Sequence, residues 1–263
     1  MSLGYLIDVQ GTLISDLDKS PLPGAVKFID YLNENLVPYC VITNNTKLKS
    51  EVFLNSLKDK GLNIKYYLDP FMVLKKSLNT NCVAAFGPKS FIDVLKELEF
   101  IVDEKKADAV LIASDIEYDA KKLAKMIYLV LNGAKIVGMH GTSIYAKDGV
   151  TYPGVGAILA MLKYATNKSA TIVGKPSPHF YEKALQILQK QNPNITFNKI
   201  TIISDDAKGD LSGAKTLGMD TKLVLTGKIK NEKEAELFKE FFDKSYPNLE
   251  SILKELNERD WSL

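Results

Sequence analysis

Short apolar runs that alternate with helical patterns constrain the fold of this 263-residue chain more than any other feature. Residues 3–9 form an apolar run that ends in an acid, residues 25–36 have helical spacing, and residues 37–43 form a second apolar run. Such runs are typical of strands buried on both faces of a parallel sheet. The pattern therefore predicts an α/β fold in which helices connect parallel strands.

The same alternation returns near the C-terminus. Residues 170–174, 200–204 and 221–225 have the composition of strands, while residues 180–191 and 211–217 have that of helices. With a further helix expected at 50–60, the two series predict a doubly wound parallel sheet. In such a sheet, ligands bind beyond the carboxyl ends of the strands.

A smaller α/β unit is expected between the two series. We predict a core in two parts, residues 1–75 and 174–263, and an inserted cap domain at residues 76–173. The charged stretch 231–260 has helical spacing and is interpreted as a solvated outer helix layer. The strands expected in the insert cover residues 82–87, 107–114 and 134–140, and its helices cover residues 90–98 and 121–132.

Composition narrows the choice of partners and compartment. The formal net charge of +2 is too balanced for a nucleic-acid-binding protein, and the lysines are spread along the chain. No apolar run is long enough to span a membrane, and no export signal is apparent. The two cysteines form no disulfide framework, and Cys40 sits in an apolar run. We expect a cytoplasmic protein.

Polar residues gather where the predicted strands of the core end. Asp8 ends the first strand, residues 43–46 (TNNT) end the second, and Lys175 follows a later one. Residues 203–210 (ISDDAKGD) supply acids that suit a hard cation with oxygen ligands. Taken alone, Asp8 would be interpreted as a residue that caps the turn after the strand. A carboxylate, a lysine, a hydroxyl and an acidic cation site at one sheet edge together indicate phosphoryl transfer.

In this order, the motifs resemble those of the haloacid dehalogenase superfamily, and more narrowly of its 4-nitrophenyl phosphatase branch. DVQGTL, VITNNT, VGKPSP and SDDAKGDLSGAKTLGM are similar to the four motifs of that family. LVLTG, PGVGAIL and the position of the insert are similar to the branch, so the resemblance covers nearly the whole chain.

The resemblance implies a role for each motif residue. Asp8 would attack phosphorus and form an aspartyl-phosphate, while Lys175 would neutralise the charge of the phosphoryl oxygens. Thr43 and Asn44 would bind those oxygens. The ligands of Mg²⁺ would be Asp8, the backbone carbonyl of Gln10 and Asp205, with Asp210 supporting through water.

The chain departs from the family pattern at Gln10, where the phosphatases have a second aspartate. That aspartate protonates the leaving group and later activates water. An amide does neither, and losing acid–base help typically costs on the order of 10²–10⁴ in rate. A lesser departure is Ser204, which stands where the family usually has glycine and which we expect to be harmless.

Other polar residues have simpler interpretations. Gly154 and Gly156 are expected to be turn and packing glycines that open a helix at 157–164 rather than a phosphate loop. His140 ends a predicted strand of the insert and faces either the substrate or a solvated loop. His179 is predicted to lie at the surface or to cap a helix. Asp206 either supports the metal site or, as we favour, is solvated. Asp115 is expected to cap a turn rather than to touch the substrate, although it or His140 could reach in to replace the acid that Gln10 lacks.

Two hypotheses about function follow. The first is a Mg²⁺-dependent phosphatase of small phosphorylated metabolites, slowed by Gln10. The second is a catalytically impaired phosphate-ligand-binding or regulatory protein on the same fold. Both take a small phosphorylated metabolite and neither needs nucleic acid or a membrane. The oligomeric state stays open, with a homodimer through the cap as one option.

Overall fold

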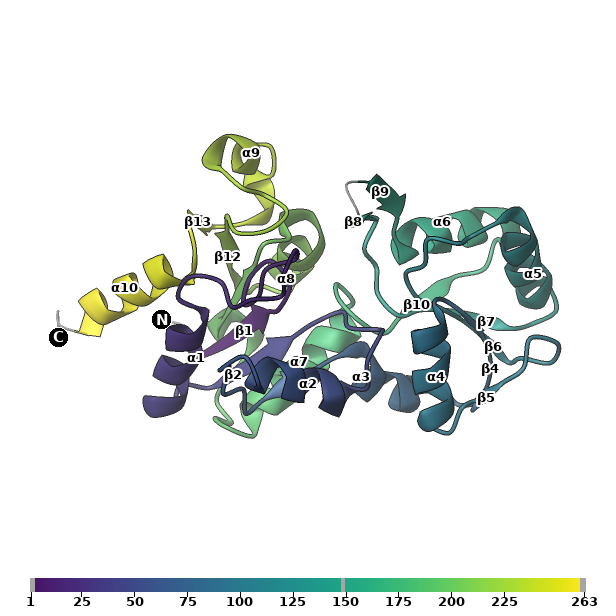
Figure 1. Cartoon of the computed structure of the whole chain (residues 1–263), viewed down its shortest axis with the longest axis horizontal. Coiled ribbons are helices and arrows are strands. Elements are labelled where there is room, and N and C mark those ends of the chain that lie inside the picture. The colour runs from purple at the N-terminus through teal and green to yellow at the C-terminus, as the bar shows by residue number, and fades with distance from the viewer. Residues whose placement is uncertain (1–2, 148–149, 261–263) are drawn as a thin grey trace. The chain divides into compact units, whose positions relative to one another are not determined.

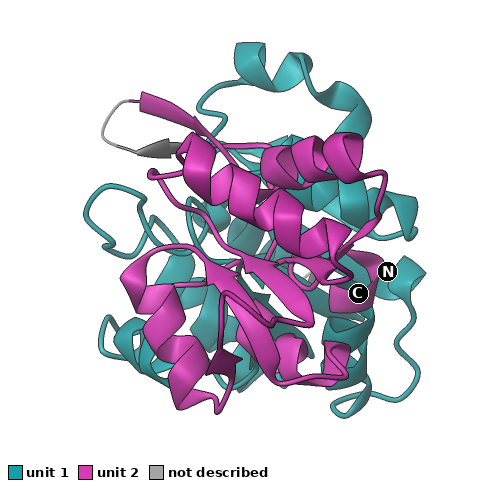
Figure 2. Ribbon diagram, turned by 90° about the vertical axis from the view of Figure 1, so that its right-hand side faces the viewer, with its two compact units in different colours: residues 1–43, 51–68, 181–263 teal, residues 44–50, 69–180 magenta. Residues whose placement is uncertain are grey.

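A computed structural model describes residues 3–147 and 150–260 and divides the chain into two compact units. Unit 1 contains residues 1–43, 51–68 and 181–263, and unit 2 contains residues 44–50 and 69–180 (Figure 2). Each unit is built on its own parallel sheet. The predicted cap boundaries at residues 76 and 173 stay a prediction.

Unit 1 is built on a six-stranded sheet with the order β13-β12-β11-β1-β2-β3, of which β13, β12, β1 and β2 are labelled in Figure 1. All five strand pairs in it are parallel. The chain runs from β1 outward to β3, returns to β11 beside β1, and runs outward again to β13. This reversal confirms the predicted doubly wound sheet and creates a switch point between the carboxyl ends of β1 and β11. The strands are β1 (Gly4–Asp8), β2 (Tyr39–Ile42), β3 (Tyr67–Leu68), β11 (Ile200–Ser204), β12 (Asp220–Val224) and β13 (Lys244–Tyr246).

The core of unit 1 forms because its central strands β1, β2 and β11 are mostly apolar and fully buried and because its helices are apolar on one face. In α1 the buried residues Ala25, Phe28, Ile29 and Leu32 recur at helical spacing and face the sheet residues Tyr5 and Ile7 in one cluster. Tyr5 also packs edge-on against Phe28. The helices that lie wholly or mostly in unit 1 are α1 (Ala25–Glu34), α2 (Ser50–Lys58), α7 (Pro178–Gln189), α8 (Ser212–Thr216), α9 (Glu232–Glu236) and α10 (Leu249–Asp260). The unit also has 3-10 turns at Phe197–Lys199 and Lys239–Phe241 and a π-helical turn at Ala207–Leu211.

Unit 2 has a five-stranded parallel sheet with the order β10-β7-β6-β4-β5 and a separate antiparallel hairpin of β8 and β9. Its helices α5 and α6 pack on the sheet through an apolar cluster that includes Met126 and Leu162. The elements are β4 (Cys82–Phe86), β5 (Ile101–Val102), β6 (Ala109–Ile112), β7 (Lys135–Gly138), β8 (Ile144–Lys147), β9 (Val150–Pro153), β10 (Ala170–Ile172), α3 (Pro70–Ser77), α4 (Lys89–Glu97), α5 (Ala120–Leu131) and α6 (Val155–Thr166).

The interpretation of residues 231–260 as a solvated helix layer is wrong in part. The segment contains β13, which pairs with β12 in the main sheet and buries Tyr246. Leu249 and Ile252 of α10 are buried in the core of unit 1. Cys40 is a buried core residue of β2, as predicted. Among the described residues, no helix combines the length and the apolar character that crossing a membrane requires.

Candidate active site

The switch point of the unit 1 sheet brings two predicted metal ligands together. Asp8 is the last residue of β1 and Asp205 directly follows β11, and these strands are adjacent and parallel. Both carboxylates are almost fully buried, with exposed fractions of 5% and 2%. Two carboxylates buried at one sheet edge are costly to hold unless a cation or hydrogen-bond donors compensate for their charge.

Asp205 is packed closely between two glycine-containing segments. Its Oδ2 accepts a hydrogen bond from the backbone N–H of Lys228 at 2.7 Å. A Cβ atom at Gly11 or at Gly227 would collide with the Asp205 carboxylate, and Gly11 also has a left-handed φ of 73°. The carboxylate therefore lies directly against the Gln10–Gly11 end of the first motif, where the predicted carbonyl ligand is found.

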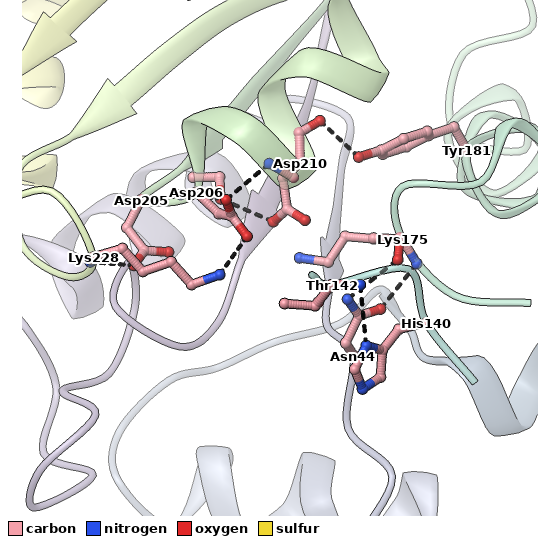
Figure 3. Close-up of polar contacts among 11 residues, drawn as sticks. Asn44, His140, Thr142, Lys175, Tyr181, Asp205, Asp206, Asp210 and Lys228 are labelled. Atoms are coloured by element: carbon pink, nitrogen blue, oxygen red, sulfur yellow. Dashed lines mark hydrogen bonds and ion pairs between the residues drawn. The ribbon is translucent and has the colours of Figure 1, made fainter. Parts of the chain in front are cut away.

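Residues 204–210, here named the acid loop, hold their other side chains in a hydrogen-bonded network. The Ser204 hydroxyl donates to Oδ2 of Asp210 at 2.9 Å and accepts from the backbone N–H of Asp206 at 3.1 Å. Oδ1 of Asp206 accepts from the backbone N–H of Gly209 at 2.9 Å, which caps the π-helical turn. The Tyr181 hydroxyl donates to the carbonyl of Asp210 at 2.9 Å (Figure 3).

This network corrects the favoured interpretation of Asp206. Asp206 is not simply solvated, because it caps the turn through Gly209 and forms an ion pair with Lys228 (Figure 3). The Ser204 hydroxyl donates to Asp210, and that the departure from glycine is harmless stays a prediction. Lys228 was not predicted, although it directly follows the LVLTG segment that resembles the family.

The electrostatics of the pair suit a cation. Burial, and then the charge of Asp8, raise the pKa of Asp205 well above its usual range, while the charge and the backbone N–H of Lys228 act in the opposite direction. Among the described residues, no group of three or more His, Cys, Asp or Glu side chains is arranged to hold a metal ion. Two carboxylates with a nearby backbone carbonyl nevertheless fit Mg²⁺, which usually keeps several of its waters. The residues present therefore fit the implied ion.

Gln10 contacts a predicted phosphate-binding residue. The buried hydroxyl of Thr43, which follows β2, donates to Oε1 of Gln10 at 2.9 Å. A hydroxyl has one hydrogen to donate. Thr43 must therefore release Gln10 before it can donate to a phosphoryl oxygen. The structure brings these two predicted site residues together, and the amide occupies the donor.

Asn44 and Lys175 meet in unit 2. Oδ1 of Asn44 accepts from the backbone N–H of Lys175 at 2.9 Å, and its Nδ2 donates to the Lys175 carbonyl at 3.4 Å (Figure 3). A Cβ at Gly174 would collide with this amide and with the carbonyl of Met139. Lys175 itself is 1% exposed. The Asn44 side chain thus fixes the backbone that carries the lysine.

The other candidate residues of unit 2 that were singled out in the sequence contact neighbouring protein groups. His140 is buried rather than solvated: its Nε2 lies 3.0 Å from the Ser114 hydroxyl, and its Nδ1 accepts from the N–H of Thr142 at 3.4 Å (Figure 3). Asp115 caps a turn through the N–H of Glu117, as predicted. Three further predictions are confirmed, since Gly154 and Gly156 pack against the backbone of residues 141–143 at the start of α6, and His179 is exposed.

Comparison with known families identifies the chain. A family model of haloacid dehalogenase-like hydrolases matches residues 5–101, and a second model of such hydrolases matches residues 172–250. The first match contains DVQGTL and VITNNT, and the second contains VGKPSP and SDDAKGDLSGAKTLGM. The chain belongs to the haloacid dehalogenase superfamily.

Individual relatives agree with this assignment. An acid sugar phosphatase of Staphylococcus haemolyticus is 28% identical over 235 residues, which cover 85% of each chain. A thermostable NPPase variant from Geobacillus stearothermophilus is 28% identical, with a TM-score of 0.74 over 95% of this chain and 98% of that one. The p-nitrophenyl phosphatase from Archaeoglobus fulgidus shares the fold, with a TM-score of 0.80 at 23% identity over 97% and 99% of the chains. The predicted superfamily, its 4-nitrophenyl phosphatase branch and the enzyme class of phosphoric monoester hydrolases are confirmed.

Proposed function

We propose that this superfamily member is a Mg²⁺-dependent phosphatase of small phosphorylated metabolites that works through an aspartyl-phosphate at Asp8. The observation that carries the proposal is the pair of buried carboxylates, Asp8 and Asp205, at the switch point of the sheet. Burying two like charges side by side is unfavourable in a protein that never binds a cation. A site for a divalent ion and a phosphoryl group accounts for both carboxylates.

Each residue of the site has its own proposed role in the attack on phosphorus. Asp8 is the nucleophile, and its carboxylate attacks phosphorus directly. Lys175 neutralises charge on the phosphoryl oxygens, while Thr43 and Asn44 bind them, Asn44 also positioning Lys175. Mg²⁺, when bound by Asp8, the Gln10 carbonyl and Asp205 with support from Asp210, supplies further neutralisation of those oxygens.

The step after attack is the weak one. Hydrolysis of an aspartyl-phosphate needs a base that activates water, and the amide of Gln10 neither takes up nor releases a proton near neutrality. The proposed enzyme is therefore slow, and it prefers esters with good leaving groups. Sugar phosphates and 4-nitrophenyl phosphate are the proposed substrates, since relatives of the chain are named for them.

The second hypothesis, a phosphate-ligand-binding protein with little turnover, is favoured by the same residue. Gln10 accepts the only hydrogen of the Thr43 hydroxyl, an arrangement that a fast phosphatase does not need. A cytoplasmic location and a homodimer through the cap accompany both hypotheses as proposals.

A metabolite panel distinguishes the two. Phosphate release should be measured over sugar phosphates, other phosphorylated metabolites and 4-nitrophenyl phosphate, with Mg²⁺ and with a chelator, beside an Asp8→Asn control. The proposed enzyme gives slow Mg²⁺-dependent release that the control lacks. Mg²⁺-dependent binding of a phosphorylated metabolite without any release would instead favour the binding protein.

A further inference from the structure

Lys228 contacts the acid loop twice from a neighbouring segment. This segment, residues 225–228, follows β12, which pairs with β11. The backbone N–H of Lys228 donates to Oδ2 of Asp205 at 2.7 Å. Its ammonium group forms a hydrogen-bonded ion pair with Oδ2 of Asp206 (Figure 3). One residue thus supplies a backbone donor to a proposed metal ligand and a full positive charge to the adjacent acid.

The segment that carries Lys228 is held in place. The Thr226 hydroxyl donates to the carbonyl of Gly11 at 2.6 Å, which ties the segment to the first motif. Gly227 packs so tightly against the Asp205 carboxylate that no larger residue fits there. The backbone that carries the Lys228 side chain is therefore fixed in position. In this ion pair, the Lys228 side chain is 45% exposed, whereas the Asp206 side chain is only 16% exposed.

Two hydrogen bonds orient the carboxylate of Asp206. Its Oδ1 accepts from the backbone N–H of Gly209, and its Oδ2 meets Lys228. One oxygen of Asp206 is thereby engaged within the acid loop and the other by Lys228. Asp8 and Asp205, which are buried, and Asp210, whose Oδ2 accepts from Ser204, complete the negative charge on this side of unit 1.

We propose that Lys228 is the resident counter-cation of the acid loop, a positioning residue that keeps the loop assembled before a divalent cation arrives. The inference rests on the Mg²⁺ site of the proposed function. Like charges held together repel, and one ammonium beside them offsets part of that repulsion. The same ammonium also repels an incoming divalent cation. Lys228 therefore stabilises the metal-free protein and weakens its affinity for Mg²⁺.

The test compares Lys228→Met with the wild type and with Lys208→Met. Methionine keeps most of the apolar stem and the backbone N–H but removes the charge. Lys208 is an exposed lysine of the same loop, so its substitution makes the same change in net charge. The unfolding midpoint Tm is measured without metal, and the Kd of Mg²⁺ is measured by calorimetry. Neither readout depends on turnover.

Without metal, Lys228→Met should lower Tm by about 2 °C, as expected for the loss of a half-exposed ion pair in a protein of this size. It should tighten Mg²⁺ binding on the order of 3- to 10-fold, because one nearby positive charge is gone. Lys208→Met should change both much less, and Lys228→Arg should restore both toward the wild type.

A metal-free Tm of Lys228→Met equal to that of Lys208→Met would overturn the proposal, as would unchanged or weaker Mg²⁺ binding. If the wild type binds no Mg²⁺, the proposed metal site fails, and the proposed weakening of Mg²⁺ affinity fails with it. The metal-free Tm still decides whether Lys228 is a counter-cation. The failure of either idea can thus be told from the failure of the other.

Discussion

Replacing Gln10 with aspartate would supply the proton-transfer group that the first motif lacks. Gln10 is half-buried beside Asp8, and its Oε1 accepts the Thr43 hydroxyl at 2.9 Å. Acid–base help is typically worth 10²–10⁴ in rate, so Gln10→Asp should raise kcat on sugar phosphates by roughly 10²-fold, which corresponds to about 3 kcal/mol of activation free energy. The gain should be smaller on 4-nitrophenyl phosphate, whose leaving group departs without protonation.

The contact with Thr43 adds a second, separable effect. An aspartate side chain is one methylene shorter, so it should release the Thr43 hydroxyl, and a released donor is worth about 1 kcal/mol toward a phosphoryl oxygen. That term should appear mainly in KM. Gln10→Asn is the matched control, since it shortens the side chain equally without providing a carboxylate.

Steady-state kinetics on one sugar phosphate and on 4-nitrophenyl phosphate, with saturating Mg²⁺, would separate these effects. Gln10→Asn should change KM but not kcat, and Gln10→Asp should change both. The reasoning is refuted if Gln10→Asp leaves kcat unchanged while the wild type already hydrolyses sugar phosphates quickly. Another residue would then supply the proton.

Three further predictions concern metal, pH and domain organisation. Asp205→Asn removes one of two buried, mutually repelling carboxylates, so it should raise the metal-free Tm and abolish both activity and stabilisation by Mg²⁺; an unchanged Mg²⁺ response would exclude Asp205 from the site. Burial would raise the pKa of Glu255, but hydrogen bonds from Lys244 and Tyr246 outweigh it and hold that pKa at about 2, below the usual 4.5. Since the folded-state pKa is lowered, Glu255→Gln should cost about 1 kcal/mol of unfolding free energy at pH 7, and this difference should shrink as the pH falls from 4.5 toward 2; a pH-independent difference would contradict the assignment. If residues 76–173 form a separate cap, limited proteolysis should nick the native chain near both ends of that range, whereas cleavage spread evenly through it would argue against the cap.

The architecture of the core could be predicted because its central strands are mostly apolar and buried on both faces. β1, β2 and β11 were expected from such runs, and the polar residues that follow them mark their carboxyl ends. Short strands at the sheet edges could not be predicted in this way. β3 has two residues and β13 three, and both depend on pairing with a neighbour rather than on an apolar pattern.

The site was predictable where a motif marks it and unpredictable where contacts come from elsewhere in the chain. Asp8 and Asp205 were expected at one edge because Asp8 ends one buried strand and Asp205 directly follows another. Lys228 was missed because its importance depends on a segment 22 residues beyond Asp206 folding back onto the acid loop. The occupation of the Thr43 donor by Gln10 likewise depends on two strands that are adjacent only in the folded sheet.

The central claim is that Asp8 carries the phosphoryl group during turnover. Its most direct test is a rapid-quench experiment with 4-nitrophenyl phosphate and Mg²⁺, followed by mass analysis of the peptides. We predict that the wild type gains one phosphoryl group on the peptide that contains Asp8 and that this adduct is less abundant in Gln10→Asp. Phosphorylation of a different residue, or undiminished hydrolysis by Asp8→Asn, would contradict the claim.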